Sequence, residues 1–366
     1  MRHQCFAVCA PGIEHLVVRE LRSLGVRRVR PLHGGVTYDA TTRQLYASNV
    51  WLRTATRVLE RVARFRAPDF AHLERAAADI PWDAWLTSDR PASFRVTTTG
   101  SRLYHTGAIE ERLQRAIGNR DGSTAADPQL MVVRVVRDEV TVSVDTSGQP
   151  LYKRGWRQET TRASMRETLA AAMLLEAGWD ATQPLLDPFS GSGTIAIEAA
   201  LLATDRAPGE RRDFAFEQWP SFQPGTWASV RSDLVRPSTP KSPTPRIIAT
   251  DRDEGAVSIA AQNATRAGVT HMIDIRRASV SEMFGPPDIV GWVVTDPPYG
   301  RRVSKGADRR DLFARFGDVA RMNLAGWNVG LLVDDLRLVG HAHLELSERF
   351  RTDNGGIPVR YLTGRV

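Results

Sequence analysis

The feature that most constrains this fold is a regular alternation of strand and helix patterns from about residue 160 to the C-terminus. Short apolar runs alternate with segments of helical periodicity. Strands separated by helices pair in parallel, so residues 158–366 are predicted to form an α/β domain with a parallel sheet. The predicted strands are 184–187, 246–251, 273–275, 292–296 and 329–333, the predicted helices are 165–177, 194–203, 254–267 and 312–324, and a predicted hairpin at 350–362 turns at 354–356.

Residues 205–245 interrupt this alternation with seven prolines, which predicts an insert followed by a stiff linker. Residues 1–66 and 67–157 are predicted to form two smaller α+β domains. The first has strand patterns at 4–10 and from 35, a helix from 14, and helical periodicity from 43 to 59. The second has a strand at 92–99, a helix at 105–117, and a hairpin of strands 131–136 and 140–145.

The basic excess of the chain lies in its first part. The formal charge is +7 and the pI about 9.9. Residues 1–157 contain 24 Lys and Arg against 16 Asp and Glu, whereas residues 158–366 contain 25 against 26. This distribution favours a polyanionic partner such as RNA for the N-terminal part.

Cys5 and Cys9 have no further cluster of Cys or His beside them, so we expect buried apolar side chains and no metal site. No apolar run approaches the length of a membrane span. Pro11 and Glu14 interrupt the N-terminus too early for a secretory signal. These features favour a cytoplasmic protein.

The most distinctive motif is Asp296-Pro297-Pro298-Tyr299, directly after the apolar run 292–295. The exocyclic amino group of a nucleobase is a poor nucleophile because its lone pair is delocalised into the ring. A carboxylate and a prolyl carbonyl can accept hydrogen bonds from that amino group, and Tyr299 offers a flat face for stacking. Proline fixes φ, so the carbonyl is presented rigidly. On its own, the motif also fits an ordinary turn that closes a strand.

A second motif joins a predicted strand to a predicted helix at residues 187–194. Its glycines let the backbone approach a ligand, and the free N–H groups of the helix N-terminus favour a carboxylate. Asp187 at the strand end can accept a hydrogen bond from an ammonium group. These properties suit S-adenosylmethionine, whose methionine part carries both groups. The predicted cofactor-binding residues of this loop are Asp187, Pro188, Phe189, Ser190, Gly191, Ser192, Gly193 and Thr194.

The rival interpretation is a dinucleotide loop, because Gly191, Gly193 and Ala196 satisfy the pattern G-x-G-x-x-A. An NAD enzyme would not need the Asp-Pro-Pro-Tyr motif at the same edge of the sheet, where ligands of open α/β sheets bind. The two motifs together indicate an amino-methylating methyltransferase. Asp251, at the end of the next strand, is predicted to contact the ribose, Arg252 to lie among the cofactor-binding residues, and Ser279 to contact the adenine.

Three further segments carry a resemblance to a family. They are the junction 144–157, the helix that begins Glu167-Thr168-Leu169, and the aromatic segment 213–219. With the two loops, they resemble the THUMP-domain RNA guanine-N2 methyltransferases, especially the bacterial branch that acts on large-subunit (23S) ribosomal RNA. The resemblance implies a Rossmann-like S-adenosylmethionine domain, preceded by an α+β ferredoxin-like and THUMP region that binds RNA. It also places Ser164 and Met165 at the cofactor.

The hypothesis that follows is methylation of guanine N2, with Asp296 and the Pro297 carbonyl accepting from the amino group of an extruded base. The resemblance and the local charge also predict RNA contacts at Lys153, Arg154, Arg157, Arg301, Arg302 and Lys305. The ribosomal branch usually has Asn where this chain has Asp296, and Asp is similar to the branch that modifies tRNA. A tRNA guanine-N2 methyltransferase, an adenine-N6 methyltransferase and a non-catalytic RNA-binding scaffold remain alternatives.

Overall fold

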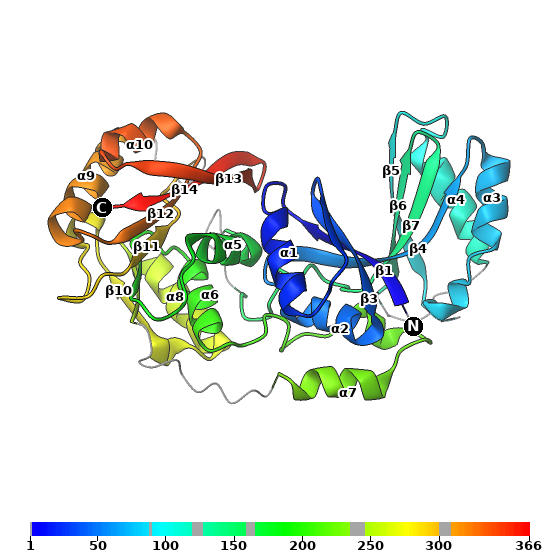
Figure 1. Ribbon diagram of the computed structural model, residues 1–366, viewed down its shortest axis with the longest axis horizontal. Coiled ribbons are helices and arrows are strands. Elements are labelled where there is room, and N and C mark those ends of the chain that lie inside the picture. The colour runs from blue at the N-terminus through cyan, green and yellow to red at the C-terminus, as the bar shows by residue number, and fades with distance from the viewer. Residues whose placement is uncertain (1, 88–89, 119–126, 159–164, 235–245, 300–308) are drawn as a thin grey trace. The chain divides into compact units, whose positions relative to one another are not determined.

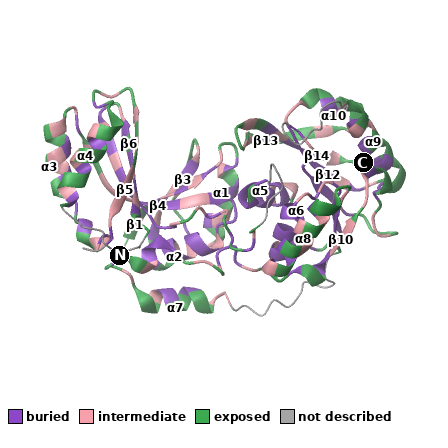
Figure 2. Ribbon diagram, turned by 180° about the vertical axis from the view of Figure 1, so that it is seen from behind, coloured by how far each residue is buried: buried purple, intermediate pink, exposed green. Residues whose placement is uncertain are grey.

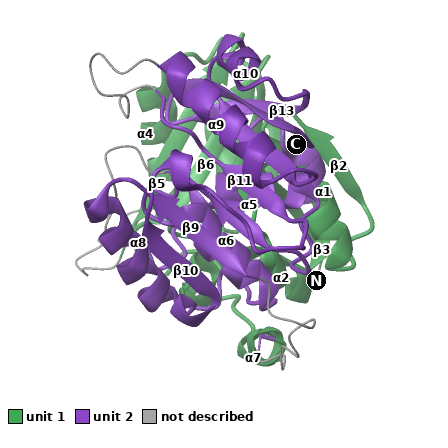
Figure 3. Ribbon diagram, turned by 90° about the vertical axis from the view of Figure 1, so that its left-hand side faces the viewer, with its two compact units in different colours: residues 1–9, 18–151, 212–233 green, residues 10–17, 152–211, 234–366 purple. Residues whose placement is uncertain are grey.

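A computed structural model describes the chain except residues 1, 88–89, 119–126, 159–164, 235–245 and 300–308 (Figure 1). The chain forms two compact units (Figure 3). Unit 1 contains residues 1–9, 18–151 and 212–233, and unit 2 contains residues 10–17, 152–211 and 234–366. Residues 212–233, which we predicted as part of an insert in the α/β domain, therefore pack with the N-terminal part of the chain.

Unit 1 is built on one seven-stranded sheet with the order β2-β3-β1-β4-β7-β6-β5. The long strand β4 pairs with β1 on one side and β7 on the other, so it joins the two predicted N-terminal domains into one sheet. Neighbouring strands of this sheet pair in antiparallel fashion, except that β5 and β6 are parallel to each other. The strands are β1 (Arg2–Cys9), β2 (Val29–Leu32), β3 (Gly35–Thr41), β4 (Ala55–Arg66), β5 (Ala92–Thr99), β6 (Gln129–Val136) and β7 (Glu139–Asp145).

The helices of unit 1 include one correction to the sequence-based prediction. The helical pattern at 43–59 was predicted too long, because α2 ends at Trp51 and β4 begins at Ala55. Leu52 has extended backbone angles, and Val58 and Leu59 are buried in the central strand, where sheet pairing decides the conformation. The helices are α1 (Glu14–Ser23), α2 (Thr42–Trp51), α3 (Phe70–Ala78), α4 (Thr106–Ile117) and α7 (Pro224–Ser232), and the first turn of α1 belongs to unit 2.

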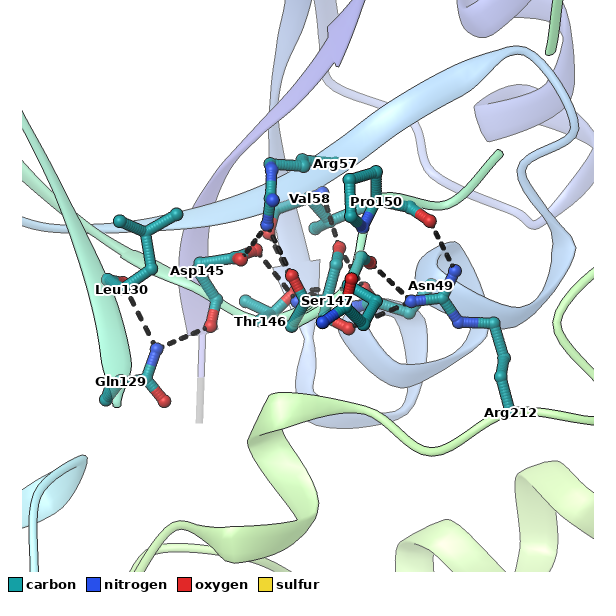
Figure 4. Close-up of polar contacts among 12 residues, drawn as sticks. Asn49, Arg57, Val58, Gln129, Leu130, Asp145, Thr146, Ser147, Pro150 and Arg212 are labelled. Atoms are coloured by element: carbon teal, nitrogen blue, oxygen red, sulfur yellow. Dashed lines mark hydrogen bonds and ion pairs between the residues drawn. The ribbon is translucent and has the colours of Figure 1, made fainter. Parts of the chain in front are cut away.

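The junction after β7 forms a polar cluster in unit 1 (Figure 4). Asp145 is fully buried and pairs with Arg57 of β4. Ser147 donates from Oγ to Oδ1 of Asn49 at 2.7 Å, and Arg212 donates to the carbonyl of Pro150 at 2.8 Å. Burial raises the pKa of Asp145 to about 6, although the Arg57 guanidinium opposes the shift. The cluster therefore fastens the junction and the start of segment 212–233 to the sheet.

Unit 2 has the parallel α/β architecture that the alternation predicts. Its sheet has the order β10-β9-β8-β11-β12-β14-β13, in which the first five strands are parallel and the terminal hairpin is antiparallel. The strands are β8 (Leu185–Asp187), β9 (Ile247–Asp251), β10 (Ile273–Arg277), β11 (Trp292–Thr295), β12 (Asn328–Val333), β13 (Leu346–Asn354) and β14 (Ile357–Arg365). The helices are α5 (Glu167–Ala177), α6 (Thr194–Ala203), α8 (Glu254–Ala267), α9 (Arg309–Asn323) and α10 (Leu336–Ala342).

Burial in unit 2 is deepest at the centre of its parallel sheet. Helices α5 and α6 are buried over nearly their whole length, and the central strands are apolar and buried on both faces (Figure 2). The predicted burial of Cys5 and Cys9 is confirmed, and neither forms a disulfide bond. Across the described residues, no helix is long and apolar enough to span a membrane. In the same part of the chain, His, Cys, Asp and Glu form no cluster suited to a metal ion.

Candidate active site

The first predicted loop leaves β8 at Asp187 and enters α6 at Thr194, at the carboxyl edge of the sheet. Gly193 is the N-cap of α6, with φ of 82°. A Cβ at this position would lie 3.0 Å from the Ala260 Cβ of α8, so glycine meets both a conformational and a packing requirement. The backbone N–H of Gly191 donates to Oδ2 of Asp251 at 3.0 Å, which ties the loop to the end of β9.

Asp187 lies at the centre of this edge and is 1% exposed. Its Oδ1 accepts hydrogen bonds from Thr295 Oγ1 at 2.6 Å and from the Phe189 backbone N–H at 3.3 Å. Burial raises the pKa of Asp187 to about 7, and the charges of Asp296 and Asp251 add to the shift, whereas the two hydrogen bonds oppose it. The carboxyl group therefore changes charge near neutral pH.

The second predicted loop follows β11, the strand beside β8. The register pairs Val293 with Leu186, so the ends of the two strands lie together and Thr295 reaches Asp187. Asp296 is 6% exposed, and Pro297 is buried. The expectation that both loops lie at one edge of the sheet is thus met. Thr295 was not predicted as a site residue. The signal that could have identified it is its position just before the motif, in a strand predicted to end at that edge.

Tyr299 is only 3% exposed. Its hydroxyl accepts a hydrogen bond from Nδ2 of Asn354, at the end of β13, at 2.6 Å. No pattern in the sequence indicates this contact. In the described conformation the ring is covered, so stacking of a base on it requires movement of the groups around it.

The other predicted cofactor residues lie around the same edge. The backbone N–H of Ala278 donates to the Asp251 carbonyl at 3.0 Å, which places the segment that contains Ser279 beside β9. The Ser279 hydroxyl donates to Glu282 at 2.9 Å, so its role at an adenine stays a prediction. The Arg252 side chain is exposed, and Met165 is buried. Ser164 lies outside the described residues.

The structure corrects the predicted RNA contacts at two arginines. Arg154 is 3% exposed and its Nε lies 3.3 Å from Glu198 of α6. The Nε of Arg157 lies 3.1 Å from Oε1 of Glu167 of α5, and its Nη2 donates to Thr194 Oγ1 at 2.7 Å. These side chains hold the junction against α5 and α6, because buried charges need partners.

The remaining predicted RNA contacts are not corrected. Lys153 is exposed, and its contact with RNA stays a prediction. Arg301, Arg302 and Lys305 lie outside the described residues.

Comparisons with known proteins agree with this architecture. A family model described as RMKL-like, methyltransferase domain matches residues 154–362, and a model of the RlmL ferredoxin-like domain matches residues 4–59. Ribosomal RNA large subunit methyltransferase K/L of Vibrio parahaemolyticus is 31% identical over 371 residues, which cover 97% of this chain and 52% of that protein. The chain thus spans about half the length of the curated relatives it matches.

Two solved structures are similar over nearly the whole chain. The putative methyltransferase SMU.472 complexed with SAH has 27% identity and a TM-score of 0.88, and the match covers 100% of this chain and 99% of that one. A predicted N6-adenine-specific DNA methylase from Listeria monocytogenes has 30% identity and a TM-score of 0.88, with coverage of 99% and 96%.

Proposed function

Because the chain belongs to the RMKL-like methyltransferase family, we propose that it transfers a methyl group from S-adenosylmethionine to N2 of a guanine in large-subunit ribosomal RNA. The observation that carries the proposal is the hydrogen bond of 2.6 Å from Thr295 to Asp187, which joins the cofactor-type loop to the start of the Asp-Pro-Pro-Tyr loop. The relatives named ribosomal RNA large subunit methyltransferase K/L support ribosomal RNA as the substrate. Such a substrate places the protein in the cytoplasm.

The residues of the first loop fit S-adenosylmethionine. Ser190 Oγ is buried and has no hydrogen-bond partner among the described residues, so a ligand donor or acceptor would satisfy it. Asp187 suits an ammonium group, because a nearby positive charge offsets the cost of burying its carboxylate. The N-terminus of α6 suits a carboxylate.

Bound S-adenosylmethionine supplies an electrophilic methyl group on a sulfonium centre. The chain's own contribution is to orient the acceptor. Asp296 accepts from the N2 amino group, and the Pro297 carbonyl accepts from the same group in a rigid direction. Both residues are buried, and a carboxylate removed from water forms stronger hydrogen bonds than an exposed one. Catalysis then rests on proximity and orientation.

Transfer leaves the acceptor nitrogen with an excess proton. The Asp296 carboxylate lies beside that nitrogen in this arrangement and can take the proton, which returns the product to neutrality. The second carboxyl group of the edge, Asp187, is hydrogen-bonded to Thr295 and Phe189 and holds the ligand rather than the proton. The two carboxyl groups therefore have separate roles.

The proposal is tested by incubating the chain with unmodified total RNA and labelled S-adenosylmethionine, followed by nucleoside analysis of each RNA size class. We expect N2-methylguanosine in the large-subunit ribosomal fraction. Label in tRNA would contradict the proposed substrate, and N6-methyladenosine would contradict the proposed base. SAH binding without methyl transfer to any fraction would favour a non-catalytic scaffold.

A further inference from the structure

The sheet of unit 1 has one covered face and one open face over strands β4, β7, β6 and β5. Helices α3 and α4 lie on one side of β5, β6 and β7 (Figure 1). The side chains on that side of β6 and β7 are apolar and buried: Met131 of β6 lies opposite Val144 of β7, and Val144 lies opposite Glu60 of β4, which is also buried. Because successive side chains of a strand point to opposite faces, the alternate residues point away from both helices.

Arginines recur on this open face in neighbouring strands. Arg64 of β4 lies opposite Thr141 of β7, which lies opposite Arg134 of β6. Arg95 of β5 lies opposite Val132 of β6. Val132 precedes Arg134 by two residues, so Arg95 lies on the same face of the sheet as Arg134. The arginines of this face are Arg61, Arg64, Arg66, Arg95 and Arg134, which we call the arginine face.

The charge of the arginine face is only partly balanced. Its nearest carboxylate in the register is Glu139, which pairs with Arg64 while both side chains stay largely exposed. Asp145 lies at the buried end of the same strand and is engaged by Arg57. Partial burial lowers the pKa of Arg61, and the positive charges of Arg64 and Arg134 lower it further. An excess of positive charge therefore remains on an exposed surface.

The chemistry of the surface favours phosphates over unstacked bases. The Arg61 guanidinium lies over the ring of Phe6 at 4.8 Å from its centroid, so that ring is already occupied by a cation. Arg64 and Arg134 are two strand spacings apart, about 10 Å. Guanidinium groups on such separate strands can each contact a different phosphate, and paired RNA is recognised mainly through its backbone and shape.

We infer that the arginine face binds the sugar-phosphate backbone of paired RNA. The inference rests on the proposed function only for the choice of RNA as the polyanion. It assigns the holding of RNA to unit 1, in place of Arg154 and Arg157, which pair with Glu198 and Glu167. Arg95 and Arg134 are exposed and lie on adjacent strands, so together they are the sites for a test.

The test is direct binding of the full chain to a labelled RNA duplex of about 16 base pairs, the length that a double-stranded RNA-binding domain spans. We expect the double variant Arg95→Glu and Arg134→Glu to bind at least tenfold more weakly at 0.1 M salt. The slope of log affinity against log salt should become shallower by about 2, one for each lost phosphate contact. Thermal unfolding and SAH binding, measured on the same variant, check that both units are intact.

The matched control is the double variant Arg75→Glu and Arg115→Glu, which changes the charge equally on the exposed sides of α3 and α4. We expect it to change the affinity less than threefold. Equal losses in both double variants would overturn the inference, because general attraction to a basic chain would then explain binding. A DNA duplex of equal length that binds as tightly would overturn RNA as the partner. Since the assay needs no methyl transfer, its result is independent of the proposed activity.

Discussion

Asn354 donates a hydrogen bond of 2.6 Å from Nδ2 to the hydroxyl of Tyr299, which lies 55 residues earlier in the chain. The donor stands at the turn of the terminal hairpin, where β13 ends. The acceptor belongs to the loop that follows β11. The hairpin therefore helps to set the position of the aromatic ring in the proposed active site.

This contact predicts a coupling between Asn354 and Tyr299. Replacing Asn354→Ala or Tyr299→Phe removes the hydrogen bond, which contributes about 1 kcal/mol, so each single variant should lose about fivefold in the rate of methyl transfer. The double variant should be no slower than the slower single variant. Single-turnover assays of the four proteins measure the coupling. Additive losses would show that the two residues act independently.

The raised pKa of Asp187 predicts a pH dependence of ligand binding. The ammonium group of SAH is expected to bind the ionised carboxyl group, whose pKa is about 7 in the free protein. The affinity should therefore fall as pH decreases through 7, approaching tenfold per unit below it. Calorimetric titration with SAH from pH 6 to 8 checks this. The Asp187→Asn variant should bind weakly at every pH, and a flat profile for the unsubstituted protein would contradict the assigned role.

The corrected position of Arg157 predicts an effect on the cofactor loop rather than on RNA. Its guanidinium holds Thr194, the first residue of α6, and pairs with Glu167. Arg157→Ala should weaken SAH binding about tenfold, the effect of losing a hydrogen bond from a charged group. Its RNA affinity should match that of the unsubstituted protein, because the Arg157 guanidinium contacts Glu167 and Thr194. Selective loss of RNA binding in Arg157→Ala would reverse this assignment.

The buried pair of Arg57 and Asp145 predicts a large effect on stability. Asp145→Ala leaves the guanidinium poorly compensated inside unit 1, so the free energy of unfolding should fall by about 3 kcal/mol. Asp233→Ala is the matched control, because Asp233 pairs with Arg43 at a site where both side chains are 43–46% exposed. The free energy of unfolding of this control should fall by less than about 1 kcal/mol. Urea unfolding of both variants measures the two free energies. Similar losses of stability in both would contradict the prediction.

The sequence predicted the architecture of unit 2 well because its signals are local. Helices α6 and α8 have the predicted bounds, and the strand–helix alternation correctly predicted parallel pairing of the strands, including β8 with β11. The loop motifs carry their own chemistry in consecutive residues. The carboxyl edge of a parallel sheet then brings them together wherever they occur in the chain.

The features that could not be predicted from the sequence depend on contacts between residues far apart in the chain. The register across β4 and β7 determines which arginines share a face, and local periodicity does not reveal it. The burial of Arg154 depends on Glu198, 44 residues later. The residues beyond Trp51 with a helical pattern do not continue the helix, because sheet pairing on both sides of β4 outweighs helix propensity. A basic residue beside a glycine or an aromatic residue therefore does not show by itself whether it faces RNA or a buried carboxylate.

The most direct test of the central claim is the single-turnover rate of methyl transfer in Asp296→Ala, measured at pH 8. At this pH Asp187 is ionised, so a change in its pKa caused by the lost neighbouring charge does not affect the comparison. If Asp296 orients the acceptor amino group, the rate should fall at least 100-fold while SAH affinity stays within about threefold. A rate equal to that of the unsubstituted protein would contradict the account.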